Sequence, residues 1–242
     1  MNLLFFFILA FLAEFAGTIA GFGSSTLLMP LAVFFFEFPV ALTLVAFFHL
    51  FGNIGRISFF KHSFDKRIFL LFGIPSIFLT ILGAFLVAFI SQPLLKVLLG
   101  TFLLGYAIFS FVKETFKLKT TIPNCIIGGS LSGFFAGLIG TGGALRGAFL
   151  TAFHLEKSVY IATAAAIALV VDLTRIPVYV LNKFLPPNQY LLLPFLAVIA
   201  LAGAFAGKKA VSSLHQKLFR KIVLACIALV SIQLLIEGIQ LL

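Results

Sequence analysis

The sequence predicts an all-α, polytopic membrane protein made of two inverted repeats, each a glycine-broken, re-entrant-like helix hairpin followed by three transmembrane helices. Of its 242 residues, 62% are hydrophobic and only 10% are charged, and the mean hydropathy is +1.22. So few polar side chains cannot cover the surface of a water-soluble fold of this length. Apolar runs of about 20 residues, each long enough to cross the hydrocarbon core of a bilayer, recur along the chain. The alternation of apolar and polar residues that is typical of a membrane β-barrel is missing.

The first repeat, residues 1–119, opens with an apolar run from residue 3 to residue 36 whose only charge is Glu14. As one straight helix this run would be about 50 Å long, which exceeds a single crossing. The sequence GFGSSTLLMP at 21–30 therefore predicts a break between two limbs, 3–20 and 24–36. Three membrane spans are expected to follow, at 38–55, 68–89 and 93–112.

The second repeat, residues 120–242, has the same plan. Its apolar run from 122 to 155 contains GLIGTGGALRG at 137–147, in which four glycines lie within seven residues: Gly137, Gly140, Gly142 and Gly143. Backbone at membrane depth can unwind only where protein or a water-filled cavity satisfies its polar groups, so this stretch predicts a broken helix that faces a cavity. Close packing of an unbroken helix is the alternative explanation for the glycines. The remaining spans are expected at 158–181, 190–207 and 222–240.

Basic residues predict the orientation of the chain. They concentrate in three segments, 56–67, 113–119 and 208–221, which the positive-inside rule places in the cytoplasm. The net charge of +10 therefore belongs to membrane topology and not to nucleic-acid binding. If each hairpin enters and returns on one side, the hairpins open toward opposite sides of the membrane, which is the architecture of many secondary transporters. If the first run crosses only once, the N-terminus lies inside and this symmetry weakens.

Three charges are not explained by the predicted loops: Arg146, Asp172 and Arg175. Charges at membrane depth are costly and usually pair or face a substrate pathway. Arg146 follows the glycine break, so its guanidinium and the N–H groups of Gly142 and Gly143 are expected to address one anion. Asp172 and Arg175 share a helix face. They are either a structural ion pair or an anion ligand with its partner, in which Asp172 is a candidate proton carrier.

Further candidates follow from the repeat and from polar side chains near the breaks. Arg56 matches Arg175, and Asn53 matches Asp172 when the two halves are aligned. His49 lies one helical turn before Asn53 and is expected either in a helix–helix hydrogen bond or in proton coupling. Hydroxyl groups beside the two breaks are candidate substrate ligands or backbone partners: Ser24, Ser25 and Thr141.

The sequence contains no phosphate-binding motif of an ATPase, and we expect no cofactor and no metal site. An intramembrane serine hydrolase would need Ser24 or Ser25 beside His49 or His154, but the G-x-S-x-G motif is missing. An enzyme is therefore not expected. A channel, or a carrier for another small anion such as a carboxylate, stays an alternative, and a homodimer is an open question.

The hairpin sequences GFGSSTLLMP and GLIGTGGALRG, one opening each half, followed by a D-x-x-R helix, resemble the TauE/SafE family of sulfite and organosulfonate exporters. This resemblance covers nearly the whole chain. It implies a multi-pass protein of the plasma membrane that transports small sulfur-containing anions such as sulfite, thiosulfate or sulfoacetate. Ser24 and Ser25 stand where members commonly carry a glycine pair, and Gly147 stands where a proline is common, so the exact substrate is open.

Overall fold

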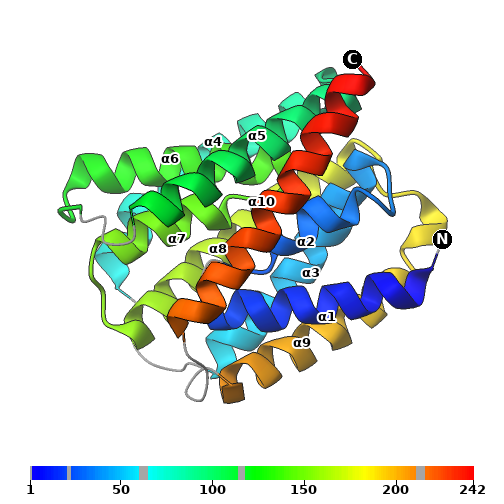
Figure 1. Ribbon diagram of the computed structural model, residues 1–242. Coiled ribbons are helices and arrows are strands. Elements are labelled where there is room, and N and C mark those ends of the chain that lie inside the picture. The colour runs from blue at the N-terminus through cyan, green and yellow to red at the C-terminus, as the bar shows by residue number, and fades with distance from the viewer. Residues whose placement is uncertain (1, 21–22, 60–64, 114–117, 211–215) are drawn as a thin grey trace.

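A computed structural model describes residues 2–20, 23–59, 65–113, 118–210 and 216–242, and these residues form helices without strands (Figure 1). The helices are α1 (Leu3–Ala20), α2 (Ser25–Ala32), α3 (Phe38–Phe59), α4 (Lys66–Leu86), α5 (Gln92–Val112), α6 (Ile122–Ile139), α7 (Gly143–Ala152), α8 (Lys157–Leu181), α9 (Leu192–Ala210) and α10 (Gln216–Gln240). Two short 3₁₀ segments, Val87–Phe89 and Pro187–Gln189, adjoin α4 and α9. Gly21 of the first predicted break, and Lys61 and Lys117 of the basic segments, lie outside the described residues.

Eight of these helices are long and apolar enough to cross a bilayer, all except α2 and α7. This confirms the prediction of an all-helical, multi-pass membrane protein. The short helices α2 and α7 occupy the second limb of each predicted hairpin, so the element order of long helix, short helix and three long helices occurs twice. The division into repeats at residue 119 stays a prediction.

The first hairpin consists of two antiparallel limbs. The ring of Phe6, near the start of α1, makes an edge contact with the ring of Phe36, with the centroids 4.9 Å apart. At the other end, the backbone of Ser24 lies directly against Gly17 of α1. The chain therefore leaves this hairpin at the end where it entered, as the re-entrant interpretation requires.

The second hairpin breaks at Gly140, whose φ of +75° a residue with a side chain rarely adopts. The N–H of Leu118 donates to the carbonyl of Ala152, so the start of α6 and the end of α7 lie together. The predicted break was too wide in one respect, because Gly137 lies inside α6. Its backbone contacts Thr80 of α4, so close helix packing accounts for this glycine.

The two halves pack in equivalent ways. Helix α1 lies along α9 on one side of the bundle, and α6 lies along α4 on the other, while α3 packs on α8 between them (Figure 1). Both termini lie at one end, where the first hairpin opens, and the second hairpin opens at the opposite end (Figure 1). These contacts favour two inverted repeats, although their inversion across the membrane stays a prediction.

A stripe of glycines joins α4 to α6. Gly129, Gly133 and Gly137 lie four residues apart, and each contacts the backbone of α4 at Phe72, Ser76 and Thr80, respectively. The Ser76 hydroxyl donates to the carbonyl of Gly129 at 2.9 Å, and that of Thr80 to Gly133 at 3.0 Å. Such close approach, with hydroxyl groups bonded across the interface, is a usual source of helix association within a bilayer.

We expect Gly133→Ala to destabilise the protein by about 1–3 kcal/mol, the usual cost of overpacking. A Cβ at Gly133 would collide with the backbone of Ser76, which cannot move away as a flexible side chain could. Gly105→Ala is the control, because nothing lies within 4 Å of its Cβ position. Thermal melting in detergent measures the difference, and equal melting temperatures for the two variants would contradict this packing argument.

Candidate functional site

Six ionisable side chains lie buried near the two helix breaks, each at most 5% exposed. They are Glu14 of α1, His49 and Arg56 of α3, Arg146 of α7, and Asp172 and Arg175 of α8. The sequence analysis named all of them as candidates except Glu14, whose role it left open. A buried set of this size at membrane depth is costly, which makes it the candidate site.

Asp172 and Arg175 form an ion pair and bind the end of α6. The Nε and Nη2 atoms of Arg175 donate to Oδ1 of Asp172 at 3.0 and 2.8 Å. Its Nη1 atom donates to the carbonyls of Ala136 and Gly140 at 2.9 and 3.1 Å. These are carbonyls that the end of α6 leaves without a partner in the helix. The guanidinium of Arg175 is thus occupied by the protein itself, which favours the structural alternative for this residue.

The other oxygen of Asp172 joins the two halves. Its Oδ2 atom accepts a hydrogen bond from Nδ2 of Asn53 at 2.9 Å and lies 2.9 Å from Nδ1 of His49. Asn53 and His49 therefore both meet Asp172, a contact that neither their common helix face nor the repeat match had indicated. The Nε2 atom of His49 and the Oδ1 atom of Asn53 are buried and have no hydrogen-bond partner.

Arg56 forms a second ion pair, with Glu14. Its Nε atom lies 3.3 Å from Oε1 of Glu14 and donates to the carbonyl of Gly52. The carboxylate of Glu14 lies directly on Gly52, where a side chain would displace it. The sequence contained one signal for this partner, a single carboxylate in an otherwise apolar run, but nothing that indicated which cation it would meet.

Arg146 differs from the other two arginines, since no carboxylate of the described residues lies within 4.0 Å of it. It is 3% exposed and lies in the first turn of α7, with its backbone N–H bonded to Gly142. Its Nη2 atom lies 3.5 Å from the position of a Cβ at Gly23, and Nε2 of His49 lies 2.8 Å from the same position. The guanidinium of Arg146 and the unbonded ring nitrogen of His49 thus both lie close to Gly23, which has a φ of +88°.

The central charges do not cancel. The three arginines carry three positive charges and the two carboxylates carry two negative ones, so the cluster has a formal charge of +1 while His49 is neutral. The excess belongs to Arg146, the arginine without a carboxylate. The hydroxyl of Ser24, beside Gly23, is also buried without a hydrogen-bond partner. A buried positive charge beside free donors is suited to bind one small anion.

The other residues predicted for the site lie around the two helix breaks. The hydroxyl of Thr141 donates to that of Thr26 at 3.1 Å and so links the two breaks. The carbonyl of Gly142 accepts from Ser132, and Gly143 begins α7. Ser25 is buried at the start of α2. The hydroxyl of Tyr179, which sequence reasoning missed, donates to the carbonyls of Ala136 and Gly137.

One candidate serine–histidine pair of a hydrolase is Ser24 with His49. The Ser24 hydroxyl makes no hydrogen bond to His49 or to any other described group. A hydrolase would need that bond to activate the hydroxyl.

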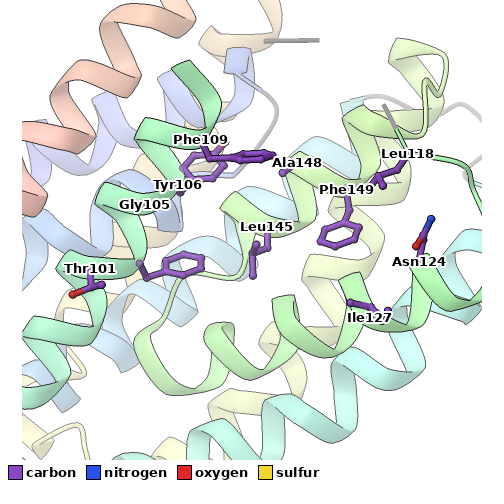
Figure 2. A pocket seen from close by; sticks show the side chains of 11 residues that line it. Thr101, Gly105, Tyr106, Phe109, Leu118, Asn124, Ile127, Leu145, Ala148 and Phe149 are labelled. Atoms are coloured by element: carbon purple, nitrogen blue, oxygen red, sulfur yellow. The ribbon is translucent and has the colours of Figure 1, made fainter. Parts of the chain in front are cut away.

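Two cavities border α7. An apolar cleft of about 570 Å³ lies between α5, α6 and α7, and Leu145, Ala148 and Phe149 of α7 line it (Figure 2). A smaller, more polar cavity of about 30 Å³ is lined by Ala20, Gly147 and Arg220, among others. The small cavity therefore touches both the residue after Arg146 and the residue before the first break.

Comparisons with known proteins identify the family. A comparison with curated proteins and one with solved structures found no match. The model of the family described as sulfite exporter TauE/SafE matches residues 6–234, nearly the whole chain. This confirms the family resemblance of the two hairpins, and a membrane transporter is consistent with the eight candidate spans. The chain belongs to the TauE/SafE sulfite exporter family.

Proposed function

We propose that the protein is a secondary transporter that moves small sulfur-containing anions, such as sulfite, thiosulfate, sulfoacetate or a related organosulfonate, across the plasma membrane. Transport occurs by alternating access and is coupled to protons. The single observation that carries this proposal is the buried guanidinium of Arg146, which lies beside Gly23 and has no carboxylate of the described residues within 4.0 Å. An uncompensated charge at membrane depth is costly, so a mobile counter-ion is the simplest account of it.

The chemistry around Arg146 suits a sulfur oxyanion. A planar guanidinium can bind two oxygens of one sulfonate or sulfite group at once. The first turn of α7 adds backbone N–H groups and the positive end of the helix dipole, since Gly143 and Ala144 have no preceding helical carbonyls. The Ser24 hydroxyl is a further donor from the opposite hairpin. A single anion would thus be held by groups from both hairpins.

The burial of the site supports the proposal of alternating access. His49, Arg146 and Ser24 are all at most 3% exposed, so an anion cannot reach them unless a hairpin moves. The small cavity at Arg220 lies beside the residue that follows Arg146. We take this cavity as the start of the route from the end of the bundle where the second hairpin opens.

The proposed orientation predicts the labelling pattern of single cysteines in membrane vesicles. In a background without Cys125 and Cys226, cysteines replacing Lys66 and Lys208 are expected to react only from the cytoplasmic side. A cysteine replacing Lys183, at the opposite end of the bundle, is expected to react only from the other side. Labelling of Lys66 and Lys208 positions from opposite sides would contradict the topology.

A thermal-shift screen of the purified protein tests the proposed substrate class. Thiosulfate, sulfoacetate and methanesulfonate are compared with acetate and malonate at equal ionic strength. Stabilisation by the sulfur anions alone supports the proposal, because a ligand that binds only the folded state raises its stability. Stabilisation by the carboxylates alone would favour a carboxylate carrier. A channel would conduct without the saturation and exchange that a carrier shows in flux measurements.

A further inference from the structure

His49 has one occupied and one free ring nitrogen. Its Nδ1 atom lies 2.9 Å from Oδ2 of Asp172. A carboxylate can only accept hydrogen bonds, and the amide Nδ2 of Asn53, 3.2 Å from Nδ1, makes its shorter bond to the same Oδ2 atom, so we assign the hydrogen to Nδ1, which donates to Asp172. In the neutral ring, Nε2 then has no hydrogen and is an acceptor. This atom is buried and has no partner.

The free nitrogen faces the proposed anion. Nε2 of His49 and Nη2 of Arg146 lie 2.8 and 3.5 Å from one point, the Cβ position at Gly23. An anion oxygen cannot occupy this point itself, which is one bond length from Cα of Gly23, but an oxygen bound beside Gly23 would contact both the guanidinium and the ring nitrogen. A neutral His49 would present a lone pair to that oxygen, whereas a protonated His49 would donate a hydrogen bond to it.

The charges around His49 determine which anions the site can neutralise. They come from Asp172 and Arg175 on α8, Arg146 on α7 and Arg56 on its own helix, whose partner is Glu14 on α1. With His49 neutral the sum is +1, which matches a monovalent anion. A divalent anion needs one more positive charge, since an unbalanced buried charge is costly.

His49 is the group in the cluster that is placed to supply this charge. Asp172 accepts hydrogen bonds or ionic contacts from Arg175, Asn53 and His49, so its negative charge is already balanced. Protonation of Glu14 would leave Arg56 without its counter-ion. Protonation at Nε2 of His49 adds a positive charge and a donor beside Gly23, where the proposed anion would bind.

We propose that His49 is the proton-carrying residue of the anion site: a divalent sulfur oxyanion binds together with one proton on Nε2, and a monovalent sulfonate binds without one. Asp172 is the positioning residue that holds the ring through Nδ1. This inference rests on the proposed function, because it requires that an anion bind at Arg146.

Calorimetric titration of the purified wild-type protein tests the inference. Thiosulfate is the divalent probe and methanesulfonate the monovalent one, since neither changes its own charge near neutral pH. Titrations at about pH 7.5, where an ordinary histidine is mostly neutral, in buffers of different ionisation enthalpy give the number of protons taken up. We expect about one proton per thiosulfate and about none per methanesulfonate, and thiosulfate affinity should fall up to about tenfold per pH unit as the pH rises.

His49→Gln is the matched variant, because glutamine keeps a polar side chain but cannot take up a proton. It should bind methanesulfonate within a few-fold of the wild type, bind thiosulfate at least about tenfold more weakly at acidic pH, and take up no proton. Unchanged proton uptake in a folded His49→Gln protein would overturn the inference.

The wild-type comparison is decisive even if the variant does not fold. Equal proton uptake with the two anions would overturn this inference alone. Binding of neither anion would overturn the proposed function and, with it, the inference.

Discussion

Arg146→Lys is expected to weaken the binding of sulfur anions by roughly 10- to 150-fold, without loss of folded protein. Lysine keeps the positive charge but is a point donor, so it cannot hold two anion oxygens in one plane. The loss of a charged hydrogen bond costs about 1.5–3 kcal/mol, which corresponds to this range of affinity. Titration of the purified variant with thiosulfate and methanesulfonate measures the change.

Arg146→Ala separates a substrate ligand from a structural residue. We expect no detectable anion binding and no transport, yet a melting temperature without anion that equals or exceeds that of the parent. The reason is that no carboxylate of the described residues lies within 4.0 Å of Arg146, so its removal relieves an unbalanced buried charge. Arg67→Ala, at an exposed position of α4, is the control and should bind anions as the parent does.

Two results would contradict this role of Arg146. Parental anion affinity in a folded Arg146→Ala protein would remove Arg146 from the site and leave Arg175 and Arg56 as candidates. Misfolding of Arg146→Ala together with parental behaviour of Arg146→Lys would identify a structural residue.

Asp172→Asn is expected to destabilise the folded protein by about 3–5 kcal/mol, the usual cost of removing one partner of a buried ion pair. The carboxylate binds Arg175 through Oδ1 and contacts His49 and Asn53 through Oδ2, so three side chains lose their common acceptor. Thermal melting and the yield of monodisperse protein in detergent measure the loss. Glu37→Gln, at an exposed carboxylate between α2 and α3, should leave both unchanged.

The double variant Asp172→Asn/Arg175→Gln tests the physical reason for this loss. Removing both charges leaves no buried ion without a counter-ion, so the double variant should recover part of the stability that Asp172→Asn loses. A double variant that is less stable than Asp172→Asn by the full cost of Arg175→Gln would show that the two residues act independently.

Much of this fold could be predicted from local patterns. Long apolar runs indicated the spans, and glycines at Gly23 and Gly140 marked the breaks where both residues adopt positive φ values. Charges inside apolar runs indicated the central cluster, because a membrane leaves buried charge few alternatives to pairing. The common helix face of His49 and Asn53 was sufficient to group them, but their contact with Asp172 was not predicted.

Contacts between helices distant in the sequence could not be predicted in the same way. Helical periodicity tells which residues share a face but not which helix that face meets. Hence nothing in the sequence indicated that Glu14 pairs with Arg56, or that Tyr179 donates a hydrogen bond to the end of α6. Gly137 was assigned to the break because glycine is common both in unwound backbone and in tight helix contacts, and only the neighbouring α4 distinguishes the two.

The apolar cleft beside α7 has a mechanical consequence. One face of this short helix carries Arg146, and the adjoining face borders the space of about 570 Å³ between α5, α6 and α7. A tilt of α7 into that space would meet no interlocked side chains, whose close packing resists deformation. By contrast, α6 is fixed to α4 by backbone contact along the glycine stripe. The half-helix that bears the proposed anion ligand is thus the compliant part of its hairpin.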